Sequence, residues 1–164
     1  MTPSLVTIGV YGASEDDFFR ALQEAGVDTV VDLRRRRGVR GSEYAYANSQ
    51  RLQARLAELG IQYVHLLELA PTEVVRKVQY VADVETKTAK RARNALSPQF
   101  ITAYREEILD RQTPALFWDA LPPGAGVVAL FCVEREAAAC HRSLVAGWLA
   151  EHEEIVVEHI VPGE

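Results

Sequence analysis

Residues that can do chemistry gather near the carboxyl end of the chain, where an apolar run leads into a polar segment. They are Cys132, Glu134, Cys140, His141, Arg142 and Ser143. A thiol beside an imidazole and a guanidinium forms a thiolate readily, and a thiolate acts as a nucleophile or as a redox-sensitive group. We therefore take Cys140 and His141 as candidates for a covalent or acid–base catalytic step, and Glu134 as the candidate that handles a proton or a hydroxyl group.

The two cysteines also have a structural interpretation. Cys132 follows the apolar run directly and can be a small core residue, and Cys140 is balanced between a reactive and a structural role. We expect iodoacetamide to label Cys140 before Cys132. Cys132 is expected to lie inside an apolar strand, where burial disfavours the thiolate, whereas His141 and Arg142 beside Cys140 favour it. A metal site made of these two cysteines and His141 lacks the paired Cys-x-x-Cys spacing of strong zinc motifs, so we expect no metal ligands here.

The apolar run from Val127 to Phe131 shows no alternation, which is typical of a strand buried on both faces of a parallel sheet. Polar residues after it then lie at the carboxyl edge of the sheet, where open α/β folds bind their ligands. The start of the next helix attracts anions through its unpaired amides. We therefore expect Cys132, Arg142 and Ser143 to contact a ligand.

A second group of polar residues follows an earlier apolar run and opens an arginine-rich loop, Arg34–Arg40. The guanidinium of Arg34 can clamp a phosphate or a carboxylate, and we expect Asp32 beside it to contact the ligand as well. The later arginines are expected to be solvated or paired. We expect Arg34 and Arg142 to converge at one sheet edge. Arg34→Ala should then weaken ligand binding and change the free energy of unfolding by less than about 1 kcal/mol, because it removes only a loop charge.

Strand and helix patterns alternate along the chain. Ser14, Asn48 and Ser97 stand where helices are predicted to begin. Strands are predicted over residues 5–10, 27–33, 61–66 and 155–161, besides the run from Val127. The pattern predicts an α/β fold of three layers, with a mostly parallel sheet of about five strands flanked by helices. The polar segment 83–94 fits an exposed helix or a mobile cover equally well.

Composition limits the classes of protein to consider. The 164 residues, 48% of them hydrophobic, predict a single domain over residues 1–164. Neither a membrane-spanning stretch nor a signal peptide is evident, so we expect a cytoplasmic protein without membrane contact. The net charge of −5 argues against a whole-protein grip on nucleic acid, and two cysteines do not make a disulfide framework. The common nucleotide-binding and hydrolase motifs are absent from the sequence.

Several short motifs occur in the order and spacing of a known family. They are Thr7-Ile8-Gly9, Val31-Asp32-Leu33-Arg34, Gly60-Ile61-Gln62-Tyr63, Leu130-Phe131-Cys132-Val133-Glu134, Cys140-His141-Arg142-Ser143 and Glu158-His159-Ile160. Over nearly its whole length the chain resembles the bacterial and archaeal domain of unknown function 488 family. The resemblance implies a compact α/β fold and a site formed by the Asp-x-Arg loop, the Cys-x-Glu segment and the Cys-His-Arg segment, without an established reaction. The chain departs from the family at Leu33–Gly38, where many members have Val-Arg-x-x-Pro-x-Ser, and at Leu69–Pro71, where Leu-Gly-Gly is frequent.

The leading interpretation is a small enzyme or binding protein for an anionic small molecule, nucleotide-like compounds included, at the carboxyl edge of the sheet. A second is a nucleic-acid-associated module that uses Arg34–Arg40 and Lys87–Arg93, whose binding would fall steeply with added salt. A third is a non-catalytic interaction domain in which the polar cluster only orders the loops. The sequence identifies no cofactor and no substrate, and it does not fix the oligomeric state.

Overall fold

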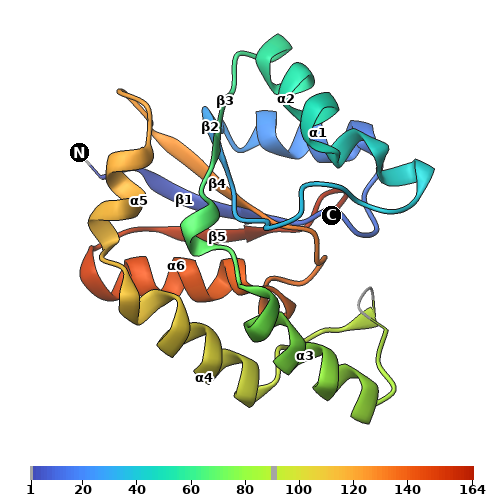
Figure 1. Ribbon diagram of the computed structural model, residues 1–164. Helices are drawn as coiled ribbons and strands as arrows, with labels where there is room; N and C mark the ends of the chain where they lie inside the picture. The colour runs from blue at the N-terminus through green and yellow to red at the C-terminus, as the bar shows by residue number, and fades with distance from the viewer. Residues whose placement is uncertain (1, 90–91) are drawn as a thin grey trace.

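A five-stranded parallel sheet runs through the centre of the molecule (Figure 1). The computed structural model describes residues 2–89 and 92–164. The strand order is β3-β2-β4-β1-β5, and every neighbouring pair is parallel. The strands are β1 (Ser4–Ile8), β2 (Thr29–Asp32), β3 (Gln62–His65), β4 (Val127–Phe131) and β5 (Val157–Ile160). The predicted α/β fold with about five strands is confirmed.

Helices cover both faces of this sheet (Figure 1). On one face lie α1 (Glu15–Glu24) and α2 (Ser49–Glu58), and on the other lie α3 (Glu73–Glu85), α4 (Pro98–Glu107), α5 (Pro114–Ala120) and α6 (His141–His152). Because successive strand residues point to opposite faces, Leu5 packs into the core under α3–α6, whereas Val6 and Ile8 pack under α1 and α2. Short 3-10 helices complete the described elements: η1 (Ser42–Ala47), η2 (Leu67–Leu69), η4 (Leu109–Arg111) and η5 (Ala137–Ala139).

Side chains at the helix starts explain where the helices begin. The hydroxyls of Ser14, Thr72 and Ser97 each accept a hydrogen bond from the backbone amide three residues later, which satisfies an amide that the helix leaves unpaired. Asn48 also stands before its helix, as predicted, but its side chain accepts from the backbone amide of Val39 instead. This bond ties the arginine-rich loop to the start of α2.

The structure refines several boundaries. The second strand covers Thr29–Asp32 rather than residues 27–33, and α6 begins at His141, which makes Cys140 its N-cap residue. Within the segment 83–94, α3 continues to Glu85, and residues 90–91 lie outside the described part of the chain. Over residues 2–89 and 92–164, helices long and apolar enough to span a bilayer are absent. The single domain over residues 1–164 and the cytoplasmic location stay predictions.

Candidate functional site

The end of β2, the end of β4 and the start of α6 meet at one edge of the sheet. His141 Nε2 lies 2.9 Å from the carbonyl oxygen of Leu33, the residue that follows β2. Because a carbonyl oxygen only accepts hydrogen bonds, Nε2 carries the proton and donates it. This bond joins residues 108 positions apart and leaves Nδ1 as the ring nitrogen that faces the two thiols.

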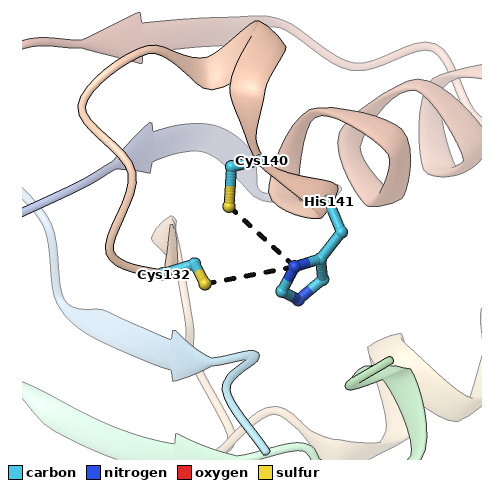
Figure 2. Close-up of side chains that lie close together, drawn as sticks. All are labelled: Cys132, Cys140 and His141. Atoms are coloured by element: carbon cyan, nitrogen blue, oxygen red, sulfur yellow. Dashed lines mark hydrogen bonds between the residues drawn. The ribbon is translucent and has the colours of Figure 1, made fainter. Parts of the chain in front are cut away.

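Cys132, Cys140 and His141 form a compact cluster at this edge (Figure 2). The Nδ1 atom of His141 lies 4.0 Å from Cys132 Sγ and 3.9 Å from Cys140 Sγ. The two sulfur atoms and this nitrogen all lie within 4.8 Å of one another. Cys132 is 6% exposed and Cys140 is 1% exposed, and both are thiols rather than half-cystines. The fold therefore brings Cys132 beside Cys140 and His141, so that three side chains able to bind a metal ion lie together.

Charges around the cluster favour a thiolate beside an imidazolium. Burial raises the pKa of the Cys140 thiol, but the hydrogen bond with Cys132 and the positive charges of Arg142 and His141 outweigh it, so this pKa lies well below its ordinary value. Burial lowers the pKa of His141, yet the neighbouring Cys140 and the Leu33 carbonyl raise it above its ordinary value. The order in which the two cysteines react with iodoacetamide stays a prediction.

Arg34 belongs to the interior of the protein. It is 3% exposed, and its Nε and Nη2 atoms donate to the two carboxylate oxygens of Asp32 at 2.9 and 2.8 Å. Its Nη1 atom donates to the Ala47 carbonyl at 2.9 Å, and the guanidinium lies 4.6 Å from the centre of the Phe131 ring. Asp32 is fully buried and also accepts a hydrogen bond from the Tyr63 hydroxyl. The expectation that Arg34 is a mere loop charge is therefore wrong.

Arg142 is fully buried and holds the loop between β4 and α6. Its Nη1 atom donates to the Glu134 carbonyl at 2.6 Å, and its Nη2 atom donates to the Arg135 carbonyl at 3.1 Å. The Ser143 hydroxyl donates to the carbonyl of the N-cap residue at 2.9 Å. The segments that carry Arg34 and Arg142 do meet at one edge, as the bond between α6 and the end of β2 shows. Both guanidinium groups nevertheless bind groups of the protein itself, and their joint binding of an anion stays a prediction.

A cavity of about 610 Å³ opens at the same edge of the sheet. Seven basic and three acidic side chains line it. The basic ones are Arg34, Arg35, Arg36, Arg40, Arg76, Lys77 and Arg93. Among the predicted site residues, the lining includes Cys132, Glu134, Cys140, His141 and Arg34, whereas Asp32, Arg142 and Ser143 lie outside it.

A comparison with models of known protein families supports the resemblance that the sequence motifs indicate. Residues 14–149 match the family model described as Domain of unknown function DUF488. The chain belongs to the DUF488 family. The matched range contains the arginine-rich loop, α3 and the Cys132–His141 segment, so the whole cluster is part of the DUF488 domain. No curated protein and no solved structure matches the chain.

Sequence reasoning missed the contribution of α3 to this DUF488 cavity, and it linked Lys87–Arg93 to the arginine-rich loop only as a surface for nucleic acid. Arg76 and Lys77 of α3 line the cavity together with residues of the arginine-rich loop. Arg93 also lines it and bridges two acids, lying 3.5 Å from Asp83 and 3.7 Å from Glu134. One signal was present in the sequence: α3 follows β3, and the carboxyl ends of parallel strands share one edge of a sheet.

Proposed function

We propose that this chain binds an anionic small molecule in the cavity at the carboxyl edge of its sheet. The observation that carries the proposal is the charge of the lining, where basic side chains outnumber acidic ones by seven to three in a protein whose net charge is −5. Concentrating one sign of charge in a concave site raises the local concentration of ligands of the opposite sign. A cavity of about 610 Å³ also lies within the usual range for small-molecule sites and suits ligands of nucleotide size.

Two guanidinium groups of the lining share a single carboxylate oxygen. Arg36 Nη2 lies 3.1 Å from Glu73 Oε1, and Arg76 Nη1 lies 3.7 Å from the same atom. One carboxylate neutralises only one of the two cations. The side chains of Arg36 and Arg76 are 74% and 36% exposed, so both can turn toward a ligand, and guanidinium groups bind phosphate and carboxylate through paired hydrogen bonds.

Arg93 adds a donor deeper in the lining. Its side chain is 10% exposed, and its Nε atom is buried without a hydrogen-bond partner in the part of the chain that the structure describes. Buried N–H groups are nearly always hydrogen-bonded in folded proteins, so an orphaned one calls for an acceptor. An oxygen of an anionic ligand provides one.

The candidate catalytic residues lie at the buried end of the lining. Cys140, His141 and Glu134 are all buried, whereas Arg36, Arg40 and Lys77 are exposed. A ligand whose charged group contacts the exposed cations can therefore reach the thiol, imidazole and carboxylate with another part. This placement supports Cys140, His141 and Glu134 as the residues that would act on the ligand.

The proposal is tested by thermal unfolding with a panel of probes: inorganic phosphate, pyrophosphate, AMP and ADP, with uncharged adenosine for comparison. At probe concentrations near 100 times Kd, binding adds about 2.7 kcal/mol of stability, which raises Tm by about 5 °C or more for a chain of this length. The decisive variant is the Arg36→Gln, Arg76→Gln double substitution. Arg111→Gln is its control, because Arg111 forms an exposed ion pair with Glu107 outside the cavity.

At least one anionic probe should stabilise the wild type and the Arg111→Gln variant, and this stabilisation should be lost in the double variant. Equal shifts in all three proteins, or shifts with adenosine alone, would show that the cavity cations are not the binding groups. Absence of any shift across the panel counts against the proposal as well. If instead a single-stranded oligonucleotide binds, with an affinity that falls steeply as salt is added, the nucleic-acid interpretation replaces it.

A further inference from the structure

The geometry points to a metal site at the buried end of the cavity. We propose that Cys132, Cys140 and His141 bind one zinc ion, with the fourth coordination position open to the cavity. This site does not depend on the anionic ligand proposed above, and its test uses no such ligand.

The spacing of the three donor atoms is close to that of a tetrahedral zinc site. With Zn–S bonds of about 2.3 Å and Zn–N bonds of about 2.0 Å, tetrahedral geometry separates sulfur from nitrogen by about 3.5 Å and two sulfurs by about 3.8 Å. Here the two sulfur–nitrogen distances are 4.0 and 3.9 Å, and all three atoms lie within 4.8 Å of one another (Figure 2). The donor atoms therefore need to approach one another by no more than about 1 Å to surround an ion.

The histidine is already oriented as a metal ligand. Metal-binding histidines almost always donate their other ring N–H to a carboxylate or a backbone carbonyl, which fixes the tautomer and the ring orientation. His141 does this through Nε2, which donates to the Leu33 carbonyl at 2.9 Å. Its Nδ1 atom therefore faces both sulfur atoms, and once the ion displaces the Nδ1 proton, the lone pair of this nitrogen would point to the place where the ion lies.

Donor type and donor number indicate the metal and the kind of site. Two thiolates and an imidazole form a soft to borderline donor set that suits zinc rather than magnesium or calcium. Structural zinc sites close with four protein ligands, whereas catalytic sites have three and keep one position for water or substrate. Among the residues that the structure describes, the cluster contains three donors, and all three line the cavity. An ion held there presents its open position to whatever the cavity binds, and it would polarise a bound oxygen as a Lewis acid.

Metal analysis of the purified full-length protein, kept reduced, tests the site directly. The reduced protein is loaded with Zn²⁺, desalted and analysed for zinc by mass spectrometry, and a parallel sample is loaded with Co²⁺ for absorption spectra. The ligand variants are Cys132→Ser, Cys140→Ser and His141→Gln. His159→Gln is the matched control, because His159 lies on β5 and contacts Thr7 rather than the cluster.

We expect one zinc ion per chain in the wild type and in His159→Gln, and a loss of affinity of about a hundredfold or more in each ligand variant. Co²⁺ should give thiolate-to-metal charge-transfer absorption that weakens when either cysteine is replaced. Sub-stoichiometric zinc in reduced wild-type protein overturns the proposal, and so does full zinc retention in both serine variants. Failure to bind zinc together with a disulfide between the cysteines in non-reduced protein would assign the pair to redox chemistry instead.

A second readout covers ligand variants that fail to fold. The chain contains only two cysteines, so iodoacetamide labelling of wild-type protein reports on this cluster alone. Zinc should slow the labelling of both cysteines at least tenfold, and a chelator should restore it. Labelling at the same rate with and without zinc overturns the proposal.

Discussion

His141 donates a hydrogen bond from Nε2 to the carbonyl oxygen of Leu33 across 2.9 Å, and this contact fastens the first residue of α6 to the end of β2. The ring cannot turn over without losing the bond, so Nδ1 stays directed at Cys132 and Cys140. Packing and site geometry are thus coupled at this edge. Substitutions that disturb the edge are expected to change stability and ligand binding together.

Arg34→Ala should be strongly destabilising. The substitution leaves the carboxylate of Asp32 fully buried without its bidentate partner, and breaking a buried ion pair in this way costs about 3 to 5 kcal/mol of unfolding free energy. Urea denaturation measures the effect. Arg36→Ala is the control, because that side chain is exposed and its loss should cost less than about 0.5 kcal/mol. A change in the free energy of unfolding below about 1 kcal/mol for Arg34→Ala would show that the buried ion pair contributes little to stability.

Gly9→Ala should destabilise the loop that carries Glu134. A Cβ atom at Gly9 would lie 1.9 Å from the Glu134 carbonyl oxygen and 3.2 Å from Arg142 Nη1, so the backbone must move. We expect a loss of about 2 kcal/mol or more. Gly147→Ala should have the opposite effect. A Cβ atom at this position in α6 would meet open space, and the substitution should raise the free energy of unfolding by about 1 kcal/mol. Thermal unfolding of both variants checks the contrast, and a stable Gly9→Ala protein would contradict the close approach.

Arg142→Lys should loosen the loop between β4 and α6 although it keeps the positive charge. A lysine ammonium lacks the planar fork with which Arg142 bridges the Glu134 and Arg135 carbonyls, so the variant should lose about 2 kcal/mol. Hydrogen exchange should accelerate at the amides of residues 133–140. Arg135→Lys keeps the charge of a side chain that forms only exposed ion pairs, with Glu136 and Glu164, and should leave exchange unchanged. Identical exchange in the two variants would show that charge alone holds the loop.

The local sequence was enough to predict much of the fold. The apolar runs predicted the strands, and the hydroxyls of Ser14 and Ser97 cap the helices that the sequence placed after them. These features depend on neighbours within a few positions. Asn48 shows where such reasoning ends, because its side chain stands at a predicted cap but bonds to Val39 in a loop whose path the sequence does not reveal.

The burial of Arg34 could not be predicted from the sequence. The sequence predicts that the later arginines are solvated or paired, and Arg36 is exposed and paired with Glu73, but Arg34 is buried against Asp32. The difference depends on how the chain turns after β2. In the same way, Cys132, Cys140 and His141 lack a metal-binding spacing, and only the closed loop between β4 and α6 brings their donor atoms within 4.8 Å of one another.

Isothermal titration calorimetry tests the central claim most directly, with the anionic probe of the panel that raises Tm most as the ligand and at fixed moderate salt. The account predicts saturable binding at one site per chain, about tenfold or more weaker in the Arg36→Gln, Arg76→Gln variant, because each charge-assisted hydrogen bond contributes about 1.5 kcal/mol or more. The Arg111→Gln control should bind as the wild type does. Binding that is non-saturable, or equally strong in the double variant, would contradict an anion site in this cavity.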